Sequence, residues 1–219
     1  MRHLYKLVFI GDGGVGKTTT INSIFQYLQK KFSDCSCPTC QDSPQSSDRT
    51  TFIDFHTITF SMQDQKVVWQ IWDLQGQRFP SNNAYTSLNP LDHITETVIT
   101  NADLILLVFD SSSNATFNEL FREQGFFDLI QPFFAPNQAL LLLENKTDLL
   151  NNGSTDTVPK VATDRIAFTL PDPLPYNNTF LENISDLTEA MLTAMHLTPE
   201  ALAHEPHPNQ TPVSLKVYR

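Results

Sequence analysis

The residues with the clearest chemistry form one short glycine-rich run that ends in lysine and threonine: Gly11, Asp12, Gly13, Gly14, Val15, Gly16, Lys17, Thr18 and Thr19. Glycines allow a backbone to wrap around phosphate groups with successive N–H groups pointing inward. Lys17 would then reach the two outer phosphates of a triphosphate, and the Thr18 hydroxyl would ligate magnesium. The alternative is a glycine-rich turn that ends in Lys-Thr by chance. The strand expected before the run and the helix expected after it favour a phosphate-binding loop.

A second group of residues, Asp73 to Gln77, could act on the phosphates that such a loop would hold. Asp73 would bind magnesium through a water molecule, the Gly76 N–H would contact the γ-phosphate, and Gln77 would orient an attacking water. A D-x-x-G-Q string alone is a weak signal, since ordinary loop turns contain it. Its position after an alternating hairpin and downstream of a phosphate loop makes it a candidate for hydrolysis chemistry.

The tetrapeptide Asn145-Lys146-Thr147-Asp148 could recognise a purine base. The Asp148 carboxylate can accept two hydrogen bonds from guanine, whereas adenine has no matching pair of donors and would leave the carboxylate unpaired. The Lys146 stem would pack over the base, and Asn145 would tie this loop to the phosphate loop. These residues favour GTP over ATP. A P-loop ATPase or a small-molecule kinase, for which the tetrapeptide would be accidental, is the alternative.

In this order and at these intervals, the three motifs resemble the Ras-like small GTPase superfamily across about Leu4 to Leu150. The resemblance implies a molecular switch that binds GTP and GDP with Mg²⁺ and hydrolyses GTP slowly. Gln77 would position the water, while Lys17 and the metal ion would stabilise the developing charge. Protein effectors, an activating protein and an exchange factor would recognise its switch regions.

The first switch is expected at Thr50 to Phe55, which resembles the same segment of Rab-type members. Thr50 falls on the family's magnesium-binding threonine, so the expected metal ligands are Thr18, Thr50 and Asp73. The string Asp48-Arg49-Thr50 is also similar to MglA-type GTPases, in which an arginine beside this threonine can supply positive charge to the transition state. Arg49 is therefore a candidate internal arginine finger. A solvated loop arginine is at least as good an interpretation.

Three features depart from the family pattern. Gln75 stands where most Ras-like members have a small alanine, which keeps open the alternative of a hydrolysis-deficient, nucleotide-loaded scaffold that acts as a protein-interaction module. Glu144 replaces the glycine that usually precedes the tetrapeptide. The fifth motif, whose backbone N–H would contact the guanine oxygen, is not plainly present. Ser185, just before the last expected helix, and the rival segment Phe168 to Leu170 are its candidates.

The elements that must position these residues alternate between strands and helices. Strands are expected at Tyr5–Ile10, Phe52–Ser61, Lys66–Trp72, Leu104–Phe109 and Ala139–Leu143, and helices at Lys17–Lys31, Ala115–Phe134 and Leu187–Met195. Ser185 and Asp186 would cap the last helix. This order, with the resemblance, predicts an α/β P-loop NTPase fold: a mostly parallel six-stranded sheet with one antiparallel strand and helices on both faces. In such sheets ligands bind at the carboxyl ends of strands.

We expect a small-GTPase-like G domain over residues 1–197, with insertions at about 33–49 and 80–101, and a proline-containing tail over 198–219. The second insertion is similar to the long connection of Rag-type GTPases. The first contains all three cysteines, Cys35, Cys37 and Cys40. They could bind zinc with a fourth ligand such as His56, or form a disulfide with one thiol left over. Structural zinc sites usually have four protein ligands, so a loop with reduced cysteines is preferred.

The chain of 219 residues carries a formal net charge of -10, which argues against nucleic acid as a partner because nucleic acid requires a basic surface. No stretch is apolar for long enough to span a bilayer, and no C-terminal cysteine encodes a prenyl anchor. We therefore expect a cytoplasmic protein without a lipid anchor. The Gln- and Asn-rich composition would also fit delivery into a host cell by a pathogen.

Overall fold

The computed structural model contains one six-stranded sheet in the order β2-β3-β1-β4-β5-β6. It describes residues 2–32, 34, 53–62, 64–74, 76, 96–123, 125–135, 138–149, 174–175 and 181–197. The strands are β1 (Arg2–Ile10), β2 (Ile53–Met62), β3 (Gln65–Leu74), β4 (Leu104–Asp110), β5 (Ala139–Asn145) and β6 (Leu174–Pro175). Strands β2 and β3 pair antiparallel, and the other neighbouring pairs are parallel. The predicted sheet is confirmed.

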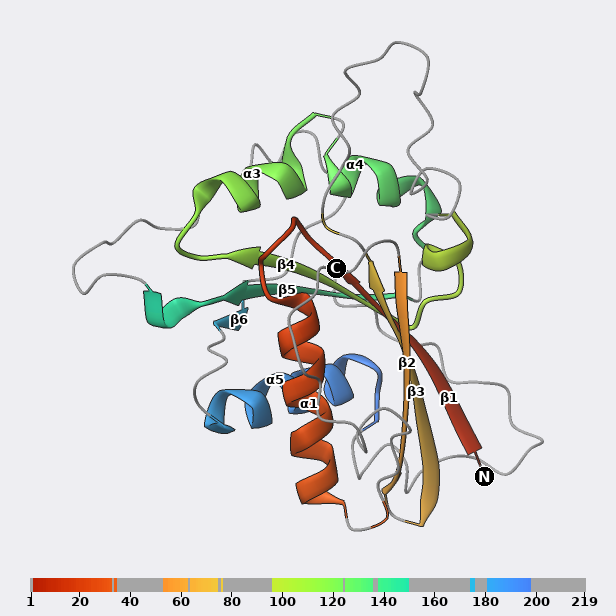
Figure 1. Cartoon of the computed structure of the whole chain (residues 1–219). Coiled ribbons are helices and arrows are strands. Elements are labelled where there is room, and N and C mark those ends of the chain that lie inside the picture. The colour runs from red at the N-terminus through yellow and green to blue at the C-terminus, as the bar shows by residue number, and fades with distance from the viewer. Residues whose placement is uncertain are drawn as a thin grey trace.

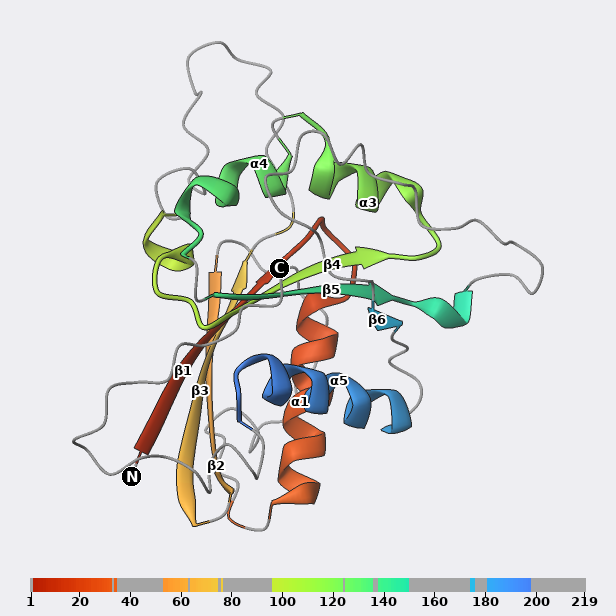
Figure 2. The same cartoon turned by 180° about the vertical axis from the view of Figure 1, so that it is seen from behind.

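Helices cover both faces of this sheet, as the sequence predicts (Figures 1 and 2). Helices α1 (Lys17–Lys31) and α5 (Leu181–Ala194) lie on one face, and α3 (Asn114–Phe121) and α4 (Phe126–Ile130) lie on the other. The 3-10 turns η2 (Gln131–Phe133) and η3 (Thr147–Leu149) follow α4 and β5, and residues 96–99 form a helical turn before β4. Within the described ranges, no helix is long and apolar enough to cross a membrane.

Strand β1 lies in the middle of the sheet and is apolar on both sides. Successive side chains of a strand point to opposite faces. Leu7 and Phe9 therefore face α1 and α5, whereas Val8 and Ile10 face α3 and α4, and all four are buried. A parallel strand with helices on both faces reads as a continuous apolar run, which is why this strand is visible in the sequence.

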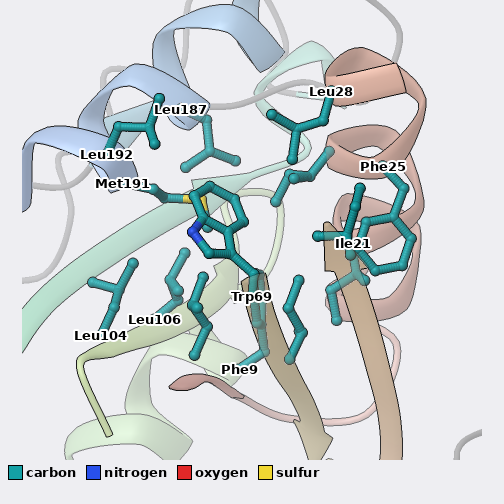
Figure 3. Packing of buried hydrophobic residues seen from close by; sticks show 14 of the residues in the cluster. Phe9, Ile21, Phe25, Leu28, Trp69, Leu104, Leu106, Leu187, Met191 and Leu192 are labelled. Carbon is teal, nitrogen blue, oxygen red and sulfur yellow. The ribbon is translucent and has the colours of Figure 1, made fainter. Parts of the chain in front are cut away.

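Trp69 of β3 occupies the centre of the core beneath α1 and α5 and is 0% exposed (Figure 3). Ile21, Phe25 and Leu28 of α1 pack in the same core, together with Met191 of α5. The α1 residues recur at the spacing of a helical face, so one stripe of the helix is buried along its length. This packing fixes the helix whose first turn follows the phosphate loop.

The helix predicted over Ala115–Phe134 is wrong as a single element, because the chain turns at Gly125 between α3 and α4. The Gly125 N–H donates to the Arg122 carbonyl at 2.8 Å, and a Cβ at Gly125 would lie 2.6 Å from that same oxygen. The close approach therefore requires glycine. Pro132 lies in the first turn of η2, where its missing N–H is tolerated.

The last helix begins earlier than predicted, at Leu181 rather than Leu187. Ser185 and Asp186, expected as caps, lie inside α5 instead. Ile184 is buried one helical turn before Leu187, so the apolar stripe begins before the predicted start.

The hairpin between β2 and β3 is tighter than predicted. Met62 and Gln65 lie outside the two expected strands, but in the structure they pair with each other as the last residues of the ladder. Asp64, in the two-residue connection, has a φ of 63°, in the left-handed region that short hairpin turns use.

Candidate nucleotide-binding site

The carboxyl ends of four parallel strands bring the candidate residues to one edge of the sheet. Phe9 of β1 pairs with Asp73 of β3, and Asp110 of β4 pairs with Asn145 of β5. The turn from β1 into α1 leaves the sheet at the same edge (Figure 1). Ligands of α/β sheets bind at this edge, so the topology assembles residues that are far apart in the sequence.

The loop between β1 and α1 has the backbone that the glycine run predicts. Gly14 and Gly16 have φ values of 77° and 94°, in the left-handed region that glycine adopts without steric cost. A Cβ at Gly11 would fall on the Val108 carbonyl oxygen, because this part of the loop lies directly against β4. The helix then begins at Lys17, so its positive end faces the loop.

Lys17 points back into this loop and is 7% exposed. Its Nζ donates to the carbonyl oxygens of Gly11 at 2.9 Å and Asp12 at 3.0 Å. Burial lowers the pKa of Lys17, and the carboxylates of Asp73 and Asp12 oppose that shift. A poorly hydrated cation held by two carbonyls is placed to meet an anionic ligand in the loop.

Thr18, the residue after Lys17, lies against Asp73. The Thr18 hydroxyl donates a hydrogen bond to Asp73 Oδ2, and Asp73 is 0% exposed. Burial raises the pKa of Asp73, while the hydrogen bond from Thr18 and the charge of Lys17 act against this shift. The two side chains offer the hard oxygen atoms that Mg²⁺ prefers, and Mg²⁺ usually completes its shell with water and phosphate oxygens. The residues present therefore fit a magnesium ion bound with a nucleotide.

Gly76, two residues after β3, reaches the phosphate loop. It is buried, and a Cβ on it would collide with the backbone of Asp12 and Gly13. Only glycine allows this approach without displacing the loop. The structure thus brings Gly76, the expected γ-phosphate contact, against the residues that would hold phosphate.

The tetrapeptide after β5 is tied to the same loop. Asn145, 0% exposed, donates from Nδ2 to the Val15 carbonyl at 2.6 Å. Lys146 has a φ of 61°, and its N–H donates to Asn145 Oδ1 at 2.8 Å. Asp148 lies in η3 and is exposed, so its carboxylate is accessible to a ligand.

The structure does not bring Ser185, the candidate for the fifth motif, together with these residues. Its hydroxyl is hydrogen-bonded to the Tyr27 hydroxyl at 2.8 Å, between α5 and α1. Tyr27 lies ten residues after Lys17, which is roughly 15 Å along the helix. Ser185 therefore joins two helices at a distance from the loop.

Strand β6 lies next to the tetrapeptide. Leu143 pairs with Leu174 and Glu144 pairs with Pro175, so β6 ends beside the start of the tetrapeptide. Sequence reasoning missed this strand because two residues carry no periodicity. The rival segment Phe168 to Leu170 precedes β6 and lies outside the described residues.

Sequence reasoning also missed Asp110, at the end of β4, which forms an ion pair with Lys146. Several predicted residues cannot be placed: Thr50, Arg49, Gln75, Gln77, Cys35, Cys37 and Cys40 lie outside the described residues, and their roles stay predictions. Across the described ranges, no three His, Cys, Asp or Glu side chains gather as a metal site.

The sheet order, with β2 as an antiparallel edge strand, and the loop between β1 and α1 define the P-loop GTPase fold. A family model described as the Ras family matches residues 6–195. The GTP-binding protein YPTC5 of Chlamydomonas reinhardtii is 34% identical over 160 residues, which make up 72% of this chain and 64% of that protein. The Ras-related protein RABG3a of Arabidopsis thaliana is 30% identical over 206 residues, or 93% of this chain and 85% of that protein.

The GTP-binding protein yptV5 of Volvox carteri is 33% identical over 150 residues, which make up 67% of this chain and 60% of that protein. The chain thus spans under two thirds of the length of the YPTC5 and yptV5 proteins. Together the matches show that the chain belongs to the Ras family, as a divergent, Rab-type small GTPase.

Proposed function

We propose that this chain is a guanine-nucleotide switch that binds GTP or GDP with Mg²⁺ and hydrolyses GTP to GDP and phosphate. One observation carries the proposal: the Val15 carbonyl, in the loop between β1 and α1, accepts a hydrogen bond from Asn145. Lys17 donates to the carbonyl of Gly11 in the same loop, and the next residue, Thr18, donates to Asp73 of β3. The residues that we propose hold the phosphates are thereby joined to the loop that we propose recognises the base. The family match over residues 6–195 supports a G domain over 1–197 with its insertions, followed by the tail.

Several groups with partial or full positive charge would bind the phosphates. Backbone N–H groups of the glycine loop and the first turn of α1 would surround the phosphates, and Lys17 would supply the full positive charge. Thr18 and Asp73, with the predicted Thr50, would hold Mg²⁺, which supplies further positive charge to the phosphates when bound. This local arrangement explains how a chain of net charge -10 would bind a triphosphate.

The base would be read by the tetrapeptide. The exposed Asp148 carboxylate would accept hydrogen bonds from guanine, and Asn145 would keep this loop at a fixed distance from the phosphates. Since β6 ends beside Glu144, the segment that follows Pro175 replaces Ser185 as the proposed source of the fifth contact.

For hydrolysis, Gln77 would orient the water, and Gly76 would contact the γ-phosphate from its position against Asp12. Arg49 or an arginine of a partner would stabilise the developing charge. Without such an arginine, turnover should be slow, on the order of 10⁻⁴ to 10⁻² per second.

A protein partner would contact the switch regions beside strands β2 and β3. Phe55 of β2 is 48% exposed and contacts Trp72 of β3 edge to face, with ring centroids 5.1 Å apart. β2 follows the segment with Thr50, and β3 leads to Gly76, so one partner could touch both switches. Exposed aromatic residues are frequent anchors of protein interfaces. We propose effectors and regulators as the partners, with no nucleic acid.

Three measurements test this function. Mass spectrometry of nucleotide released from the purified protein should find GDP or GTP. ATP should fail to displace labelled GDP, and Asp148→Asn should weaken GDP binding. Displacement by ATP as effective as that by GTP would instead indicate an ATP-dependent protein.

Single-turnover phosphate release separates the active switch from the scaffold alternative. Wild type should release phosphate from GTP faster than Gln77→Leu, both alone and with candidate activating proteins. Equal rates with intact GTP binding would mean that the chain is a nucleotide-loaded scaffold.

A further inference from the structure

Asp110, the last residue of β4, forms an ion pair with Lys146 that no sequence motif anticipates. Asp110 Oδ2 and Lys146 Nζ are 2.6 Å apart, and Asp110 is 8% exposed. Lys146 is more exposed, and its side chain is the part of the tetrapeptide proposed to pack over the base. A buried carboxylate therefore holds the tip of a side chain that would contact the ligand.

The Asp110 carboxylate is itself fixed in orientation. Its Oδ1 accepts hydrogen bonds from the Ser112 N–H at 2.9 Å and the Ser112 hydroxyl at 2.6 Å. This leaves Oδ2 for Lys146. Burial would raise the pKa of Asp110, but the hydrogen bonds from Lys146 and Ser112 outweigh burial and lower it. The carboxylate is thus charged at neutral pH and has a partner at each oxygen.

The backbone of Lys146 is equally constrained. Its φ of 61° is in the left-handed region, which is unfavourable for a residue with a Cβ. The Lys146 N–H donates to Asn145 Oδ1, and the Asn145 carbonyl accepts from the Ser111 N–H at 2.9 Å. These hydrogen bonds to Asn145 therefore fix the backbone of Lys146, and the ion pair with Asp110 fixes the end of its side chain.

We propose that Asp110 is a positioning residue for the purine base: by holding Nζ, it aligns the methylene stem of Lys146 as one wall of the base pocket. The inference rests on the proposed guanine-nucleotide function. A long lysine side chain loses considerable rotamer freedom when it is ordered against a ligand. The ion pair orders it beforehand, so less freedom is lost when the nucleotide binds.

Asp110→Asn and Lys146→Met test this inference through the dissociation rate of a fluorescent GDP analogue. Asparagine keeps the acceptor for Ser112 but removes the charge, and methionine keeps an apolar stem but removes the ammonium group. We expect Asp110→Asn to raise the dissociation rate about tenfold, equivalent to ~1.4 kcal/mol. In the Lys146→Met background, Asp110→Asn should add nothing further, because Asp110 acts only through Lys146.

A merely structural role would give another pattern. In that case Asp110→Asn would lower the melting temperature of the nucleotide-free protein and speed dissociation equally in both backgrounds, which would overturn the inference. An unchanged or slower dissociation rate would overturn it too, since the ion pair would then compete with the nucleotide.

Glu119→Gln is the matched control. It breaks the exposed ion pair between Glu119 and Arg122 on α3, 2.8 Å apart, and should leave the dissociation rate unchanged. If wild type itself bound no GDP, the proposed function would fail; GDP binding that is insensitive to Asp110→Asn would defeat the positioning role alone.

Discussion

The side chain of Asn145 donates a hydrogen bond to the carbonyl of Val15, 2.6 Å away and 130 positions earlier in the chain. Both residues are 0% exposed, so neither polar group has water as a substitute partner. A buried bond between two loops at the carboxyl edge of the sheet sets their spacing. It also makes the position of the loop after β5, which we propose recognises the base, depend on the loop that we propose holds the phosphates.

Asn145→Ala should therefore harm both stability and binding. The Val15 carbonyl would lose its partner, and a buried unsatisfied group costs about 1–3 kcal/mol. We expect this loss in the free energy of unfolding, measured by urea denaturation, and a GDP dissociation rate raised by about tenfold or more. Asn118→Ala, on the exposed side of α3, is the control and should change neither quantity. An unchanged dissociation rate in Asn145→Ala would show that the two loops are independent.

Two glycines of the phosphate loop should differ in their tolerance of alanine. At Gly14 nothing lies within 4 Å of an added Cβ, so the cost is that of a left-handed alanine, about 1–2 kcal/mol. At Gly11 the Cβ would fall on the Val108 carbonyl oxygen, and the loop would have to move away from β4. Gly11→Ala should cost about 3 kcal/mol or more. Thermal denaturation of the nucleotide-free protein measures the difference, and a larger loss at Gly14 would contradict it.

Ser185→Ala should weaken the fold without affecting the ligand. The lost hydrogen bond with Tyr27 is worth about 0.5–1.5 kcal/mol, and Tyr27→Phe should cost a similar amount. The two substitutions remove the same bond, so their combination should cost little more than either alone. Dissociation of GDP should match wild type in all three variants. Faster GDP dissociation in Ser185→Ala alone would indicate that this serine contacts the nucleotide after all.

Glu144→Gln should stabilise the protein at neutral pH. Burial raises the pKa of Glu144, so the folded state holds the carboxylate less favourably than the unfolded state does. This cost is present above the folded-state pKa and disappears as the pH falls through it toward the ordinary value of about 4.3. Solvent screens much of this cost because the carboxylate is only half-buried, so the melting temperature of the variant should exceed that of wild type by no more than roughly 2 °C at pH 7.5.

The advantage of Glu144→Gln should shrink as the pH is lowered toward the ordinary pKa of a glutamate. Glu189→Gln, at an exposed position of α5, provides the comparison and should show no such gain. An advantage that is constant with pH would mean that packing, rather than charge, distinguishes the two side chains.

Local patterns made the backbone of the glycine-rich loop and most strands predictable. The run Leu104 to Phe109 is apolar without interruption because β4 has helices on both faces, and glycine spacing alone predicts the bend before Lys17. The predicted helix over Ala115–Phe134 failed because its apolar residues continue across the break. The turn at Gly125 depends on contact with carbonyls of α3, which periodicity does not encode.

Residues whose position depends on strand pairing were not predictable. Ser185 resembles a motif residue in sequence, but it lies inside α5, which begins at Leu181, and it is bonded to Tyr27 of α1. Asp110 meets Lys146 because β4 and β5 are parallel neighbours in register, and the two residues are 36 positions apart. No spacing rule along the chain links such a pair.

The burial of β1 on both faces has a kinetic consequence. Its segment from Leu7 to Ile10 pairs with β4 on one side, and all but Ile10 also pair with β3 on the other. Helices cover both faces of this segment, so fraying of a terminus or loss of one helix does not expose it. Amide protons there should exchange with solvent only through opening of the whole domain. The loop proposed to bind phosphate continues directly from this strand, so the strand should stay folded in the nucleotide-free protein and hold the start of the loop in place.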